Sequence, residues 1–116
     1  MFSIYYAGKM SKMSQGQVRD DFTNKVIDLK MGWKFYTSQH EGLDLDETHT
    51  YVATTTLDDK EEIFRCFQGE FASQDFCDMI HESDATHTSM SVGDVLVEVG
   101  SGRKFFCDCM GFVEVE

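Results

Sequence analysis

Short runs rich in aromatic and β-branched residues recur along this chain of 116 residues and predict β-strands. Six runs have this character, and they span residues 2–7, 33–37, 48–55, 94–99, 103–109 and 112–115. Side chains alternate between the two faces of a strand, so Val95, Val97 and Val99 are expected on one face and Leu96 on the other. The Gly-Ser-Gly segment after Val99 predicts a turn into the next strand.

An amphipathic helix is predicted after the first strand. Four apolar residues at spacings of four, four and three share one helical face, namely Val18, Phe22, Val26 and Leu29. Ser14 precedes this pattern and is expected to cap the N-terminus of the helix. Gly32 follows it, where a glycine with positive φ commonly ends a helix.

Two further helices are predicted between the strands at 48–55 and 94–99. Thr56 is expected to cap the first, with Asp59 at its third position and Gly69 after its end. Ser73 is expected to cap the second, which runs through His81. Apolar residues at helical spacing would be buried, and they are Ile63, Phe64 and Phe67 in the first helix and Phe76 and Ile80 in the second.

Strands and helices are mixed along the chain, without an internal repeat or a low-complexity linker. We therefore expect a single α+β domain over residues 1–116, with a mostly antiparallel sheet packed against two or three helices and a C-terminal hairpin or meander. Apolar residues make up 41% of the chain, so a buried core can form. No run approaches the roughly 20 apolar residues of a membrane span, and the start lacks a signal-peptide pattern, which predicts a cytoplasmic protein without membrane contact.

Charge is divided unevenly along the chain. Residues 1–40 carry six Lys and Arg against three Asp, a balance of +3, whereas residues 41–116 carry four against eighteen Asp and Glu, a balance of −14. The acidic part would repel a phosphate backbone, so direct DNA binding is not expected. A field of this sign instead attracts a basic partner, although many proteins are acidic only because charge keeps them in solution.

Seven carboxylates form the predicted partner-binding surface, and they are Asp44, Asp46, Glu47, Asp58, Asp59, Glu61 and Glu62. The first three lack the ligand pattern of a calcium-binding loop. A solvated face is the alternative interpretation for all seven. As a binding surface, they would meet a basic region of another protein.

Cys107 and Cys109 are two residues apart on a predicted strand, so both thiols are expected on one face. Such a pair could chelate a metal or cycle between redox states. Further ligands could come from Cys66, Cys77, His81 or His87. No second closely spaced pair exists, and the spacing matches no zinc finger. We therefore expect a reduced, packed pair without a metal or another cofactor.

The segment at 87–95 reads His-Thr-Ser-Met-Ser-Val-Gly-Asp-Val and contains the residue types of a hydrolytic site. Ser89 or Ser91 could act as nucleophile, with His87 as base and Asp94 orienting that base. Residues so close in sequence rarely reach this geometry, and no nucleophile elbow is present, so we do not expect an enzyme. The same residues are typical of a turn that leads into a hairpin.

Three stretches stand together in the C-terminal half, and they are Thr56-Leu57-Asp58-Asp59 with Ile63-Phe64, the segment 87–95, and Phe106-Cys107-Asp108-Cys109-Met110-Gly111-Phe112. Residues 56–116, which contain them, resemble the YodL-like domain of mobile elements and are similar to small proteins of T4-like phages, especially cyanophages. Gly93 and Cys109 stand where relatives often carry Ser. The resemblance implies a bacteriophage or mobile-element origin, hence a host-cell cytoplasm, and it carries no catalytic residues.

Charge and resemblance together predict a small non-enzymatic protein that binds a host protein. A sharper version is a defence inhibitor of the anti-CRISPR or anti-restriction type, whose acidic surface occupies a basic nucleic-acid channel. One alternative is a module for a small ligand or RNA, which would use the aromatic residues Trp33, Phe35 and Tyr36 and a basic rim of Lys9, Lys12, Lys30 and Lys34. The other is a metal-binding protein built on the cysteine pair.

Overall fold

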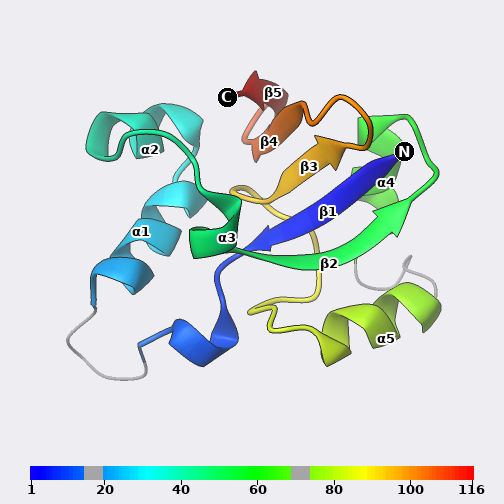
Figure 1. Cartoon of the computed structure of the whole chain (residues 1–116), viewed down its shortest axis with the longest axis horizontal. Helices are drawn as coiled ribbons and strands as arrows, with labels where there is room; N and C mark the ends of the chain where they lie inside the picture. The colour runs from blue at the N-terminus through cyan, green and yellow to red at the C-terminus, as the bar shows by residue number, and fades with distance from the viewer. Residues whose placement is uncertain (15–19, 69–73) are drawn as a thin grey trace.

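The computed structural model describes residues 1–14, 20–68 and 74–116. These residues form one five-stranded antiparallel sheet, five α-helices and a short 3₁₀ turn at Met10–Lys12 (Figure 1). The strands are β1 (Phe2–Ala7), β2 (His49–Thr55), β3 (Val95–Glu98), β4 (Lys104–Asp108) and β5 (Gly111–Val115). The helices are α1 (Asp21–Lys30), α2 (Trp33–Gln39), α3 (Leu45–Thr48), α4 (Lys60–Cys66) and α5 (Gln74–Glu82). None of these helices is long and apolar enough to cross a membrane.

The strand order across the sheet is β2-β1-β3-β4-β5. β1 lies between β2 and β3, although both are distant from it in sequence, and the last three strands follow one another as a meander. The predicted α+β class, antiparallel sheet and C-terminal meander are therefore confirmed. The described residues contain five short helices rather than two or three.

One face of the sheet, which we call the α4 face, is covered by α4 and α5. Phe2, Ile4 and Tyr6 of β1 point to this face, because alternate residues of a strand share a side. They pack with Leu96, Phe105, Ile63, Phe67 and Ile80. Each large apolar side chain buried in this way contributes about 1.5–3 kcal/mol to stability.

The opposite face, which we call the α1 face, is covered by α1, α2 and α3 at one end only (Figure 1). Ala7, Val95 and Phe106 are buried at that end, beneath apolar residues of α1 and α2. Toward the other end, Tyr5 and Val97 are half-buried, and the side chain of Tyr51 is 48% exposed. Part of the α1 face is thus open to solvent.

The strand predicted at 33–37 is wrong, because these residues form most of α2. The helix starts after Gly32, and a carboxylate oxygen of Asp108 accepts a hydrogen bond from the backbone N–H of Trp33 at 3.3 Å. Trp33 then stacks on Tyr36 one turn later, with ring centroids 5.7 Å apart. A run of only five aromatic and polar residues is compatible with the spacing of a strand and with that of a helix. The contacts with the rest of the fold therefore decide which one forms.

Two predicted helix caps are also wrong. Asp20, rather than Ser14, caps α1 by accepting a hydrogen bond from Thr23 N at 2.8 Å. Asp59, rather than Thr56, caps α4. Both caps are aspartates that stand closer to the first helical turn than the predicted residues, and Asp is at least as good a cap as Ser or Thr.

The remaining predictions for these elements differ in their outcome. β3 ends at Glu98, so Val95 and Val97 share the α1 face as predicted, whereas Val99 lies beyond the strand. Val18, Gly69 and Ser73 lie outside the described residues, so their predicted roles stay predictions. α5 is present as expected, and Ile80 in it is buried.

Candidate functional site

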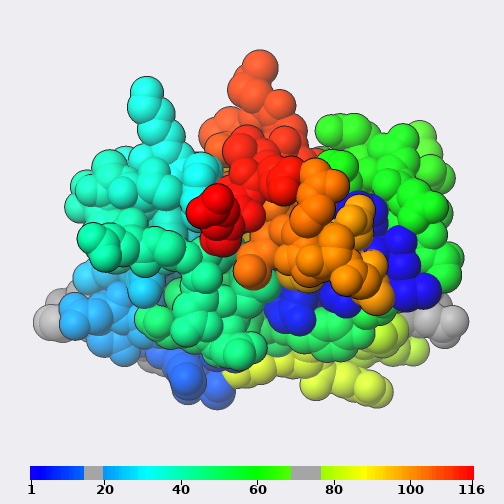
Figure 2. Space-filling view, turned by 45° about the horizontal axis from the view of Figure 1, so that its top comes forward, coloured from blue at the N-terminus to red at the C-terminus, as the bar shows by residue number. Residues whose placement is uncertain are grey.

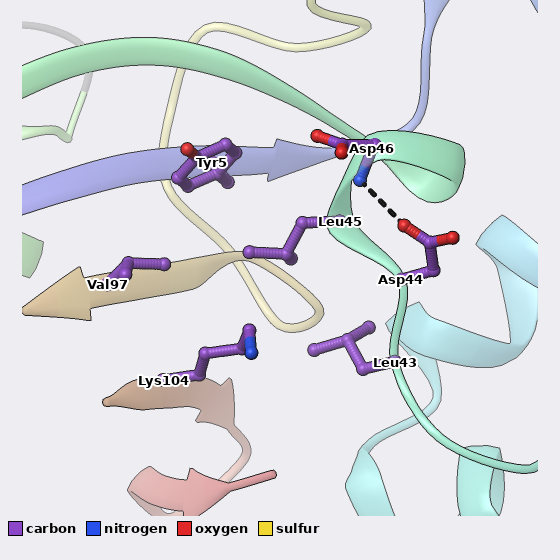
Figure 3. A pocket seen from close by; sticks show the side chains of 7 residues that line it. All are labelled: Tyr5, Leu43, Asp44, Leu45, Asp46, Val97 and Lys104. Atoms are coloured by element: carbon purple, nitrogen blue, oxygen red, sulfur yellow. Dashed lines mark hydrogen bonds between the residues drawn. The ribbon is translucent and has the colours of Figure 1, made fainter. Parts of the chain in front are cut away.

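The open part of the α1 face contains a hollow of about 560 Å³ (Figure 3). We call it the sheet hollow, and it is lined by Tyr5, Leu43, Asp44, Leu45, Asp46, Val97 and Lys104. These residues come from β1, β3, β4 and the segment that forms α3. Strand pairing brings them together, because Val97 pairs with Ser3 of β1 and with Lys104 of β4.

The apolar residues of the sheet hollow lie beside a second exposed aromatic ring. Tyr5 meets the ring of Tyr51 edge to face, with centroids 5.6 Å apart. The hydroxyl of Tyr51 lies 2.7 Å from Thr54 Oγ1, which fixes the ring on the open face. Large rings that are exposed on a monomer and held in place are typical of surfaces that bind another molecule.

Two carboxylates stand at the α3 side of the sheet hollow. Asp44 caps α3, and its Oδ1 accepts a hydrogen bond from Asp46 N at 3.1 Å (Figure 3). Both side chains are exposed. Lys104 lies across the hollow on β4, and it takes no part in the ion pairs found among the described residues. The hollow therefore combines apolar surface with two acidic groups and one basic group.

The seven predicted acidic residues do not form one cluster. Asp44, Asp46 and Glu47 precede β2 at one end, whereas the other four, Asp58, Asp59, Glu61 and Glu62, follow β2 at the other end. The seven residues of β2 separate the two groups by roughly 20 Å. Only the first group lies beside the sheet hollow.

Several of these carboxylates are occupied by local contacts. Glu47 Oε1 accepts a hydrogen bond from Lys25 Nζ at 3.0 Å, and this bond raises the pKa of Lys25. Asp58 pairs with the N-terminal ammonium group at 2.8 Å. Glu62 lies 3.9 Å from Arg65 on α4. Exposed pairs of this kind contribute little to stability, so these residues remain able to exchange partners.

The predicted motif loop forms a hydrogen-bonded centre around Asp94. This carboxylate is fully buried and accepts backbone hydrogen bonds from Ala7 N and Ser91 N, each at 2.8 Å. His87 Nε2 lies 3.0 and 3.1 Å from its two oxygens. The His87 ring stacks on Tyr6, with centroids 4.6 Å apart. Asp94 thus attaches the segment before β3 to the end of β1.

This centre brings two predicted residues together but does not resemble a hydrolytic site. Both ring nitrogens of His87 are engaged, since Nδ1 lies 3.0 Å from Thr86 Oγ1. Ser91 contacts Asp94 through its backbone N–H rather than through its hydroxyl. Ser89 also makes an interaction and is not a free hydroxyl. The geometry is that of a structural link between β1 and the segment before β3. It does not place a free base next to a serine nucleophile.

Cys107 and Cys109 differ in their environments. Cys107 lies in β4 on the α4 face, and burial, followed by the nearby Asp94 and Asp108 charges, raises the pKa of its thiol to about 12. Cys109 lies in the turn after β4 and is exposed, so the prediction that both thiols lie on one strand is wrong. No group of three or more potential metal ligands occurs in the described part of the chain. The thiol of Cys107 is therefore protonated at neutral pH, which makes it a weak nucleophile.

The aromatic residues predicted for a small-ligand or RNA site mostly belong to the core. Tyr36 is fully buried, and its hydroxyl donates to the carbonyl of Gly42 at 3.0 Å. Trp33 packs against Phe106, with ring centroids 5.1 Å apart. Phe35 on α2 is the most exposed of the three, at 41%. These rings do not form the concave aromatic surface that this alternative requires.

Sequence reasoning found Asp44 and Asp46 but missed the rest of the sheet hollow. The sequence places Tyr5, Val97 and Lys104 in strands, but it does not indicate which face of the sheet remains exposed to solvent. Alternation along β3 correctly placed Val95 and Val97 on one face. The coverage of one face by three short helices depends on tertiary packing, and no local signal reports it.

Comparisons of the chain with protein-family models, with curated proteins and with solved structures gave no match. The resemblance of residues 56–116 to the YodL-like domain therefore stays a prediction from the sequence.

Proposed function

We propose that this protein is a non-enzymatic interaction module that binds a basic region of a partner protein in the sheet hollow. The observation that carries the proposal is the open α1 face, where Tyr5, Val97 and exposed Tyr51 adjoin the carboxylates of Asp44 and Asp46. Tyrosine rings supply much of the binding energy in protein interfaces, and rim charges select the partner and speed its approach.

A protein partner fits this surface better than a nucleic acid. Asp44 and Asp46 stand at the edge of the hollow, and residues 41–116 carry a balance of −14, so phosphate groups would be repelled. A Lys or Arg side chain can lay its methylene groups on Tyr5 and Val97 while its charge reaches the carboxylates. This combination favours a basic segment that also contains apolar residues.

The finer part of the proposal concerns the setting. If residues 56–116 share their origin with phage and mobile-element proteins, the partner is a host protein in the cytoplasm. A host protein with a nucleic-acid-binding surface would carry the required basic charge. Binding there would exclude nucleic acid and would make this chain a defence inhibitor.

A capture experiment with matched variants tests the proposal. Immobilised wild-type protein, Tyr51→Ser and Phe35→Ser are each incubated with host lysate, and retained proteins are quantified by mass spectrometry. Tyr51 and Phe35 are comparably exposed, at 48% and 41%, but only Tyr51 lies on the open part of the α1 face. We expect a basic protein that wild type and Phe35→Ser retain equally and that Tyr51→Ser retains several-fold less. Equal retention by all three proteins would contradict the proposal.

A further inference from the structure

β5 is an edge strand of the sheet. Among the described residues it pairs with β4 alone, and β4 separates it from β3. Val113 and Glu114 in its middle are exposed. The C-terminal strand reaches the molecular surface between α2 and the hairpin of β3 and β4 (Figure 2).

The pairing register shows which backbone groups of β5 face outward. Cys107 N donates to the carbonyl of Asp94 at 2.8 Å, and Gly93 N donates to the carbonyl of Cys107 at 3.0 Å, so Cys107 faces β3. Successive residues of a strand alternate in this direction, hence Phe106 faces β5 and bonds its partner Val113. The N–H and C=O groups of Phe112 and Glu114 therefore point to the free edge.

Of the features that prevent an edge strand from pairing with another chain, β5 has a short length and the charge of Glu114 but no backbone irregularity. β5 contains no Pro, no Lys and no register shift over its five residues. The other edge strand, β2, has an irregular register opposite Ile4 and Tyr5. Of the two edges, β5 offers the more regular template for an added strand.

A pocket of about 220 Å³ lies beside the edge on the α4 face. Phe112 of β5 and Phe64 of α4 contribute aromatic rings, which meet edge to face at 6.5 Å. The side chain of Glu61 also lines the pocket and lies near Gly111. A residue paired with Phe112 from outside would direct its side chain to this same face.

We infer that the free edge of β5 binds an extended basic segment of a partner protein, which adds a strand to the sheet and places a Lys or Arg side chain in the pocket of Glu61, Phe64 and Phe112. The carboxylate of Glu61 pairs with the cation, and the two rings contact its methylene groups and charge. This inference rests on the proposed function for the class of partner, but it assigns a second surface and a different binding mode.

A second copy of this chain fits the edge less well than a basic partner. β5 reads Gly-Phe-Val-Glu-Val and supplies no cation for Glu61. Two copies would also bring together chains that each carry a net charge of −11. Arg103, which precedes β4, already forms two hydrogen bonds with Glu114, at 2.6 and 3.0 Å.

Synthetic peptides with blocked termini test the inference directly. The probe is an alternating Val-Lys hexapeptide, and its controls are the Val-Glu counterpart and a Val-Lys peptide N-methylated at alternate amides. Glu114→Pro removes a backbone N–H that points to the free edge. Its matched control, Glu114→Thr, keeps this N–H, and both variants lose the ion pair with Arg103. Binding is followed by fluorescence anisotropy and by hydrogen exchange of the Phe112 and Glu114 amides.

We expect the Val-Lys peptide to bind and to slow exchange of both amides, with affinity at least about tenfold weaker for Glu114→Pro than for Glu114→Thr. N-methylation and Glu61→Gln should each weaken binding as well. Equal affinities for the two Glu114 variants, or no binding at millimolar peptide, would overturn the inference. A wild-type dimer that Glu114→Pro converts to a monomer would overturn it too, because a second copy would then occupy the edge.

The result is separable from that of the proposed function. Tyr51→Ser, on the opposite face, should bind the peptide as wild type does. If peptide binding depends on Tyr51 and not on the Glu114 backbone, the β5 inference fails while the sheet hollow remains the binding site. If Glu114→Pro and Glu114→Thr differ in peptide affinity while Tyr51→Ser binds as wild type does, the β5 edge binds the peptide independently of the sheet hollow.

Discussion

His49 and Asp94 are buried polar side chains, and hydrogen bonds account for both. His49 Nε2 lies 2.8 Å from the carbonyl of Gly93, and its Nδ1 lies 2.7 Å from Thr48 Oγ1. The carbonyl of Gly93 can only accept, so Nε2 carries a hydrogen and donates to it. The one proton of the Thr48 hydroxyl is shared between Nδ1 and the carbonyl of Asp44, which lies 2.9 Å away. Burial lowers the pKa of His49 to about 4, despite the opposing effects of the hydrogen bond to Gly93 and of the Asp94 charge.

The buried His49 predicts a loss of stability in mild acid. The unfolded chain takes up a proton at His49 as pH falls through 6.5, whereas the folded protein resists protonation until about pH 4. The contribution is therefore fully present above pH 6.5 and is lost between pH 6.5 and 4, by about 3 kcal/mol in total. Urea unfolding at pH 7, 5.5 and 4.5 measures this loss.

His49→Gln is the control for this pH dependence, since a neutral amide cannot titrate. We expect the variant to be less stable than wild type at pH 7 and to lose less stability on acidification. Parallel pH profiles for the two proteins would show that other groups, such as the exposed carboxylates, cause the acid sensitivity instead.

At the scale of elements, α2 shows how one distant residue decides a local structure. Gly32 precedes the helix with φ of 106°, and a Cβ at this position would lie 2.9 Å from Asp108 Oδ1. The same carboxylate accepts the hydrogen bond of Trp33 N. A side chain at Gly32 would therefore displace the group that caps the helix.

Gly32→Ala and Gly100→Ala form a matched pair for this claim. Both glycines have φ above 100°, but a Cβ at Gly100 would meet no atom within 4 Å. We expect Gly100→Ala to cost about 1 kcal/mol from backbone strain alone. Gly32→Ala should cost about 1 kcal/mol more, because it also breaks the hydrogen bond to Asp108. Equal losses in urea unfolding would show that Asp108 does not stabilise α2.

Sequence reasoning identified most elements and failed where tertiary contacts decide. The strands β1, β2 and the C-terminal meander were predictable because they are short runs rich in aromatic and β-branched residues. The segment at 33–37 has the same composition, yet Asp108 and Phe106 hold it as a helix. Capping was misassigned because several Ser, Thr and Asp residues precede each helix, and only geometry shows which one accepts the bond.

At the scale of the whole molecule, the sheet separates two kinds of surface. α4 and α5 cover one face, whereas α1, α2 and α3 leave part of the other open and create the sheet hollow. The predicted acidic residues fall at the two ends of β2, one group beside the hollow and the other in and just before α4, where Glu61 lines the pocket next to β5. Two acidic regions next to two accessible parts of one sheet suit a partner that carries basic charge over an extended area.

The most direct test is the affinity of the captured partner for a charge variant of the sheet hollow. Asp44→Asn with Asp46→Asn removes two charges and keeps the cap of α3, because Asn caps helices as well as Asp does. Asp21→Asn with Glu82→Gln removes the same charge from exposed positions outside the hollow. Isothermal titration at low and high salt should show at least about tenfold weaker binding for the first pair at low salt, with a smaller difference at high salt, and near wild-type binding for the second. Equal affinities for both pairs would contradict the assignment of the sheet hollow as the binding site.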